Sequence, residues 1–84
     1  MPTIHRERGY RFYFNANENN EPAHIHIRGK EGRMKIWLKN CSVASNPRPR
    51  GIPSHEQTKL LEIVEFNQKK FLHDWEEFRK REKN

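Results

Sequence analysis

Hydrophobic and polar side chains alternate along three stretches in the N-terminal half of the chain, at residues 10–14, 24–28 and 34–39. A period of two is typical of a β-strand with one face in the core and the other in solvent. Turn-forming residues at 15–22 and a four-residue loop at 29–32 separate these stretches, as in a meander of antiparallel strands. A short additional edge strand is expected at residues 3–6. The pattern therefore predicts an antiparallel sheet of three or four strands within residues 3–39.

A helical period replaces this alternation after residue 53. At 100° per residue, several large apolar side chains fall on one stripe: Leu60, Val64, Phe71, Trp75 and Phe78. Ser54 and Gln57 match a capping box, so we expect the helix to begin at this serine. Asn67 and Gln68 interrupt the stripe, which leaves two alternatives. Either one kinked helix spans residues 54–81, or two helices join near Asn67.

The simplest arrangement of these elements is an α+β domain in which the C-terminal helix covers one face of the meander. The chain of 84 residues has room for a single domain, 1–84, with the sheet at 3–39, a connector at 40–53 and the helix at 54–81. The covered face is expected to consist of Phe12, Phe14, Ile25, Ile27, Met34, Ile36 and Leu38. The opposite face is expected to carry Arg11, Tyr13, His24, His26, Arg28, Lys35, Trp37 and Lys39. One side of the sheet is thus predicted to be apolar, and the other basic and aromatic.

The charge of the chain is concentrated in the predicted sheet. Residues 1–53 contain ten lysines and arginines against four acidic residues, so the whole net charge of +6 belongs to this part. Such an asymmetry indicates an acidic partner, either a nucleic acid or an acidic protein. No apolar run approaches the ~20 residues of a membrane helix, so we expect a cytoplasmic protein without membrane contact. The single cysteine, Cys41, excludes an internal disulfide and a cysteine-rich zinc site.

The sharpest local motif is the pair His24 and His26. On a strand, residues two apart point to the same face, with Cα atoms about 6.6–6.8 Å apart, which suits two ligands of one metal ion. A third ligand would have to come from His5, Glu21 or Glu31. The alternative is a pair of exposed or hydrogen-bonded histidines without chemistry.

A further alternative is proton transfer on phosphate, because histidine titrates near neutral pH. A metal-independent ribonuclease needs a base, an acid and a cation, and His24, His26 and Arg28 are the candidates for these catalytic roles. We expect this chemistry to need no metal and no cofactor. The nucleic-acid-binding candidates on the same face are Arg11, Tyr13, Lys35, Trp37 and Lys39.

Several segments occur in an order that resembles the small bacterial "domain of unknown function 4160" family. They are MPTI at 1–4, YRFYF at 10–14, EPAHIHI at 21–27, KIWL at 35–38 and WEEF at 75–78, and the resemblance covers residues 2–78. It implies a cytoplasmic bacterial protein of a toxin–antitoxin pair, with a cognate small antitoxin-like protein as partner. It supplies no catalytic residues and no oligomeric state.

Together these observations predict a toxin-like component that acts on RNA through the basic face of the sheet. Two other functions stay open: a non-catalytic module that binds protein or nucleic acid, and a small metal-binding protein that uses the histidine pair. All three hypotheses place the function on the same side of the sheet.

Overall fold

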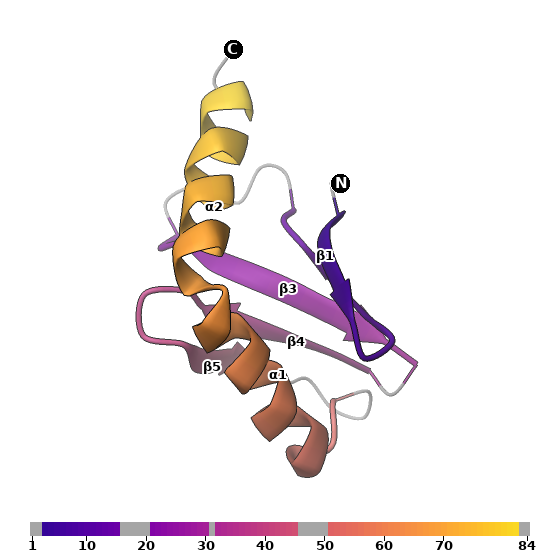
Figure 1. Ribbon diagram of the computed structural model, residues 1–84. Coiled ribbons are helices and arrows are strands. Elements are labelled where there is room, and N and C mark those ends of the chain that lie inside the picture. The colour runs from indigo at the N-terminus through magenta and orange to yellow at the C-terminus, as the bar shows by residue number, and fades with distance from the viewer. Residues whose placement is uncertain (1–2, 16–20, 31, 46–50, 83–84) are drawn as a thin grey trace.

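The chain begins with five strands, each of which pairs with the next. They are β1 (Thr3–Glu7), β2 (Tyr10–Tyr13), β3 (His24–Gly29), β4 (Gly32–Trp37) and β5 (Ser42–Ser45). The computed structural model describes residues 3–15, 21–30, 32–45 and 51–82. Within these residues the strands form one antiparallel sheet in the order β1-β2-β3-β4-β5, with the helices following in the chain (Figure 1). The predicted α+β class is confirmed.

The prediction of three or four strands is wrong, because the sheet has five. The additional strand, β5, lies within the segment 40–53 that was predicted to be a connector, of which residues 46–50 lie outside the described residues. Its sequence, SVAS, contains a single strongly β-forming side chain, Val43, and so gives no alternating pattern. The strand forms because Cys41, in the left-handed region with φ 52°, turns the chain back along β4.

Two helices follow the sheet, α1 (Ser54–Phe66) and α2 (Gln68–Glu82), so the alternative of two helices near Asn67 is confirmed. The Asn67 side chain and backbone N–H both donate to the carbonyl of Ile63, at 2.9 and 3.1 Å. Gln68 Nε2 donates to the carbonyls of Leu38 and Lys39, at 2.7 and 2.9 Å. The Asn67 side chain thus bonds to the last turn of α1, and the Gln68 side chain ties the start of α2 to the turn between β4 and β5.

The first helix begins at Ser54 as predicted, but the capping box does not form. Pro53 occupies the N-cap position, and no side chain caps the helix. Gln57 Nε2 instead donates to the carbonyl of Ile52, 2.8 Å away. Since Ser54 lies inside the helix and not before it, its hydroxyl is not in the capping position.

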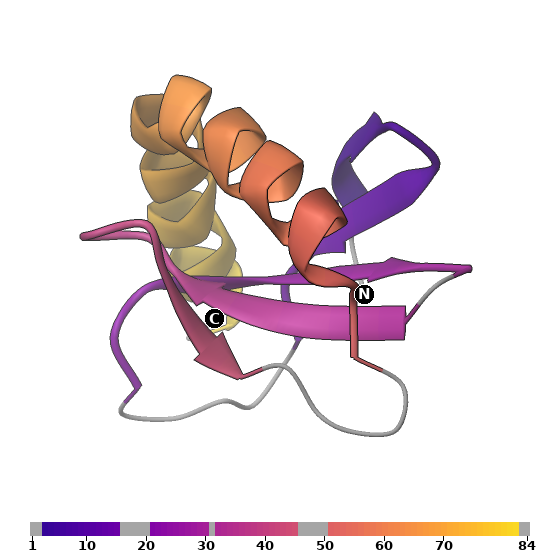
Figure 2. The same ribbon diagram turned by 90° about the horizontal axis from the view of Figure 1, so that it is seen from below.

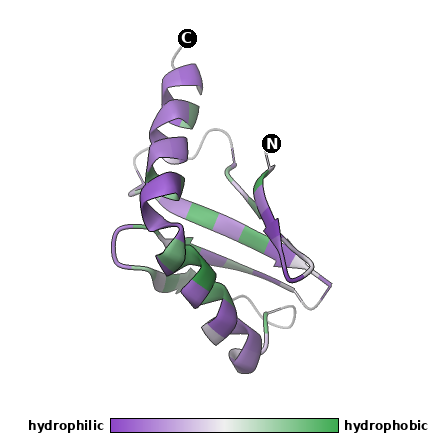
Figure 3. Cartoon of the chain, in the orientation of Figure 1, coloured by the Kyte–Doolittle hydropathy of each residue, from purple (hydrophilic) through white to green (hydrophobic). Residues whose placement is uncertain are grey.

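The core lies between the helices and one face of the sheet, and Figure 2 shows α1 lying across that face. All seven side chains predicted for the covered face are buried: Phe12, Phe14, Ile25, Ile27, Met34, Ile36 and Leu38. On the helices the stripe residues Leu60, Val64, Phe71 and Trp75 are buried, while Phe78 is half-buried. The apolar stripe of α1 and the alternation along β3 are visible in the hydropathy colours of Figure 3. The predicted assignment of these side chains to the covered face is therefore correct.

Gly29 sits where the core leaves no room for a side chain. A Cβ atom at this position would lie 2.7 Å from Tyr10 Cε1. We expect Gly29→Ala to reduce the free energy of unfolding by about 1–3 kcal/mol, because the tyrosine ring must move. Lys30→Ala, at the exposed next residue, should change it by less than about 0.5 kcal/mol. Chemical denaturation of both variants measures the two changes in stability. Equal midpoints would contradict the predicted clash between a Cβ atom at Gly29 and the Tyr10 ring.

Candidate functional site

The helix-free face of the sheet is organised in rows that run across the strands. Residues directly opposite each other on antiparallel strands project to the same face. In the first row Arg6 lies opposite Arg11, Arg11 opposite Arg28, and Arg28 opposite Arg33. One arginine thus comes from each of the strands β1, β2, β3 and β4. Because neighbouring strands are 4.7–4.9 Å apart, the row extends over about 14 Å.

This arginine row is electrostatically unfavourable on its own. Like charges directly opposite each other destabilise a sheet, and no described carboxylate forms an ion pair with any of the four arginines. Three of the side chains are exposed, and Arg11 is half-buried with its guanidinium carbon 4.7 Å from the centroid of the Tyr13 ring. The row therefore concentrates positive charge, which an anion bound there would neutralise.

A second row, of Tyr13, His26, Lys35 and Ser45, runs beside the arginines. The Tyr13 and His26 rings stack with centroids 5.4 Å apart, and Asn15 Nδ2 lies 3.3 Å from His26 Nε2. A hollow of about 280 Å³ lies over this row, lined by Tyr13, Asn15, His26, Arg33, Met34, Lys35 and Ser45. The hollow borders both rows, because Arg33 of the first row also lines it.

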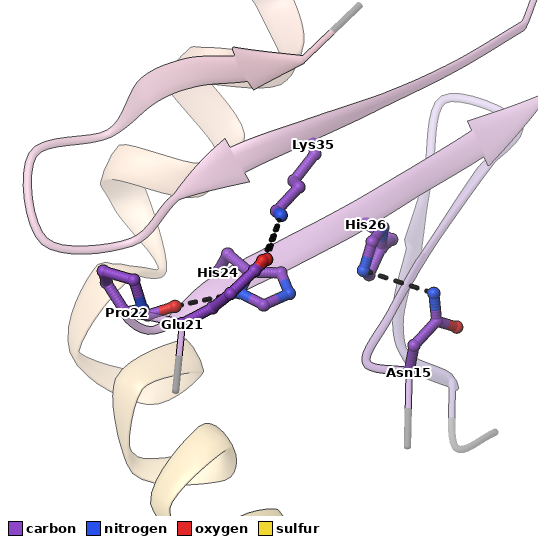
Figure 4. A network of polar contacts seen from close by, with 6 residues as sticks. All are labelled: Asn15, Glu21, Pro22, His24, His26 and Lys35. Atoms are coloured by element: carbon purple, nitrogen blue, oxygen red, sulfur yellow. Dashed lines mark hydrogen bonds and ion pairs between the residues drawn. The ribbon is translucent and has the colours of Figure 1, made fainter. Parts of the chain in front are cut away.

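The Lys35 side chain forms an ion pair with Glu21, a residue that lies in no strand of the sheet. Its Nζ donates to both carboxylate oxygens of Glu21, at 2.6 and 2.8 Å, and lies 4.9 Å from the centroid of the Trp37 ring. Figure 4 shows Glu21 reaching from the segment before β3 to this lysine, with His24 beside it and His26 further along the strand. The carboxylate thus neutralises one of the basic side chains of the face.

The third row begins with His24, which lies opposite Trp37 as the register predicts. The histidine is nevertheless fully buried, because α2 passes the start of β3 and brings the Trp75 ring within 4.9 Å of the imidazole (Figure 1). His24 Nδ1 donates to the carbonyl of Pro22, 2.8 Å away. Because the His24 ring is fully buried, a ligand bound on the sheet surface does not reach it in this conformation. The proton-transfer role of His24 stays a prediction.

We use the name basic face for the cationic and aromatic side chains of the three rows other than His24. Tyr13 is buried among them and the rest are exposed or half-buried. The members are Arg6, Arg11, Tyr13, His26, Arg28, Arg33, Lys35 and Trp37. Six of these come from the sequence-predicted set, while Lys39 lies beyond β4 in the turn to β5. Arg6, Arg33 and Asn15 were not among the candidate residues predicted from the sequence, and Glu21 was predicted only as a candidate metal ligand. Arg33 could have been found from the sequence, because the loop predicted at 29–32 already places it opposite Arg28. In the structure the two residues are partners, and the strands extend one pair further, to Gly29 and Gly32.

The chain matches one protein family over most of its length. The family described as domain of unknown function DUF4160 matches residues 9–76. The chain belongs to this family. The match runs from the start of β2 into the second half of α2 and confirms the family resemblance. No curated protein and no solved structure gives a significant match.

In this DUF4160 domain the histidine pair has no third metal ligand among the described residues, since no group of three His, Cys, Asp or Glu side chains gathers there. His5 faces the helices, 5.2 Å from the Phe12 ring, and is hydrogen-bonded to Glu7. Glu21 binds Lys35, and Glu31 lies outside the described residues. The metal-binding alternative therefore gains no support from the geometry.

Cys41 is not activated as a nucleophile in this DUF4160 domain. Burial raises the pKa of the Cys41 thiol, and the Glu65 carboxylate adds to the rise. The thiolate is the reactive form, so the shift keeps the side chain neutral near pH 7. None of the described helices is long and apolar enough to cross a membrane.

Proposed function

We propose that this DUF4160 domain binds single-stranded RNA on its basic face, as the toxin-like component of a bacterial toxin–antitoxin pair in the cytoplasm. The observation that carries the proposal is the arginine row, which crosses four strands without a described carboxylate partner. Cations in such a row bind successive phosphates of a polyanion. The cognate small antitoxin-like protein is proposed as the regulating partner, on the family resemblance alone.

The aromatic side chains beside the arginines favour RNA with unpaired bases. His26 and Trp37 are half-buried, so part of each ring faces solvent on the same side as the arginines. Stacking of bases on aromatic rings, combined with cations for the backbone, is the usual mode of single-stranded recognition. An acidic protein supplies negative charge but has no bases that could stack on the aromatic rings. The aromatic rings therefore favour single-stranded RNA over an acidic protein as the ligand.

Binding fits the geometry better than cleavage. A metal-independent ribonuclease needs two proton-transfer groups in contact with the reacting atoms. On the basic face His26 is the one described imidazole with an exposed part, because His24 is fully buried. The ribonuclease therefore stays a prediction, and RNA binding is the function that the arrangement supports best.

The proposal is tested by fluorescence anisotropy with a short labelled single-stranded RNA at several salt concentrations. If the four arginines contact four phosphates, the logarithm of the binding constant should fall with that of the salt concentration, with a slope of about −3. Trp37→Ala should weaken binding about tenfold through loss of one stacked base. Phe66→Ala, at an exposed aromatic residue of α1, is the matched control and should leave binding unchanged. Salt-independent binding, or equal effects of the two substitutions, would contradict the proposal.

A further inference from the structure

We propose that the Lys35 ammonium is a phosphate-binding position of the basic face, which the Glu21 carboxylate occupies while RNA is absent. The inference rests on the proposed RNA-binding function. It adds the ligand group that Lys35 takes and the side chain that competes with it.

The contact between the two side chains has the form of an ammonium bound to an anionic ligand. Both carboxylate oxygens of Glu21 accept from Lys35 Nζ, at 2.6 and 2.8 Å. The Lys35 side chain is 20% exposed and the Glu21 side chain 32%, so water screens the pair less than it screens a fully exposed one. A phosphate offers the same charged oxygen acceptors. The carboxylate therefore competes directly with a phosphate for this ammonium.

The surroundings of Lys35 suit a phosphate. His26 lies directly opposite on β3, and Arg33 lies two residues away on β4, with its Cα about 6.8 Å distant on the same face. All three side chains line the hollow of about 280 Å³. A phosphate held there by Arg33 and His26 reaches Lys35 once the carboxylate leaves.

The Glu21 side chain can move away from Lys35 while the backbone of the next two residues stays in place. The carbonyl of Pro22 accepts from His24 Nδ1 at 2.8 Å, and the carbonyl of Ala23 accepts from the Leu38 N–H at 2.9 Å. Glu21 itself precedes β3 and lies in no strand. Rotation about its side-chain bonds therefore frees Lys35 without moving the anchored backbone.

This competition sets the size of the expected effect. A site that is open for only part of the time binds with an apparent affinity reduced by that fraction. If the Glu21 carboxylate occupies Lys35 for about four-fifths of the time, as expected for an ion pair of ordinary strength, its removal strengthens binding about fivefold.

The test compares Glu21→Gln with Glu62→Gln, which makes the same change in net charge on the exposed surface of α1. Binding of the short labelled single-stranded RNA is measured by anisotropy, and circular dichroism confirms that each variant is folded. We expect Glu21→Gln to bind about fivefold more tightly than Glu62→Gln. Glu21→Asp keeps the charge but withdraws the carboxylate from Lys35, and it should also bind more tightly than the wild-type protein.

A second set of variants, made in a protein that lacks Lys35, distinguishes release of the Lys35 ammonium from a general change in the electrostatic potential of the surface. In a Lys35→Met protein, Glu21→Gln should bring no gain, because the position that the carboxylate blocks is gone. A gain of the same size there, or no difference between Glu21→Gln and Glu62→Gln, overturns the inference while RNA binding by the wild-type protein upholds the proposed function. Absence of RNA binding in every variant overturns both.

Discussion

Arg11→Glu/Arg28→Glu should weaken binding of single-stranded RNA by about 100-fold or more, equivalent to about 2.7 kcal/mol. These two residues are the inner members of the arginine row. Each reversal removes a charge-assisted contact with phosphate and adds a repulsive charge beside the next one. The fold should not suffer, because each introduced carboxylate lies directly opposite an arginine, Arg6 or Arg33. Two of the three like-charge pairs of the row thus become opposite-charge pairs, and only the central pair stays like-charged. Loss of binding with an unchanged or higher melting temperature is the expected signature.

The matched control reverses two exposed lysines on the helices, Lys59→Glu/Lys69→Glu, which makes the same change in net charge away from the basic face. The control should lose much less affinity than the row variant, because exposed charges beyond a Debye length are largely screened. In bacteria, inducible expression should arrest growth with the control and not with the row variant. Equal losses of RNA affinity in the two proteins would show that net charge, and not the arginine row, determines binding.

The fold was predictable wherever one face of an element is clearly apolar. The alternation around Phe12, Ile25 and Ile36 specified both the strands and the buried face, because a shift of one residue exposes every core side chain. No such pattern exists at β5, whose four residues include a 38% exposed valine, Val43. That strand depends on pairing with β4 and on the turn at Cys41, which are properties of the folded chain.

The candidate site was predictable in composition and not in arrangement. The face assignment of Arg11, His26 and Lys35 follows from the period of two, since their strand neighbours are buried. The arginine row depends on the register between strands, which alternation within one strand does not specify. The contact between Glu21 and Lys35 joins residues 14 positions apart, and the burial of His24 requires Trp75 from α2. Such contacts are set by the tertiary structure.

His24→Ala should lower the free energy of unfolding by about 3 kcal/mol, within the range for large-to-small substitutions in a core. The imidazole packs against two tryptophan rings, with centroids 4.9 Å from Trp75 and 5.8 Å from Trp37. The substitution leaves a cavity between them and removes the hydrogen bond to the Pro22 carbonyl. Since small domains are typically stable by only about 5–15 kcal/mol, this is a large fraction of the total. Denaturant midpoints measure it, with the exposed His73→Ala of α2 as control; equal midpoints would contradict a structural role.

The same variant distinguishes the two roles of the imidazole. If His24 supports the basic face through packing, His24→Ala studied well below its melting temperature should bind single-stranded RNA within about twofold of the wild-type protein, because the arginine row is intact. Its effect on bacterial growth should then follow the amount of folded protein. A folded His24→Ala protein that binds RNA normally but no longer arrests growth would instead indicate a chemical role for the ring. His26→Ala serves as the comparison, since its half-buried ring lies on the basic face and its loss should weaken RNA binding more than it lowers stability.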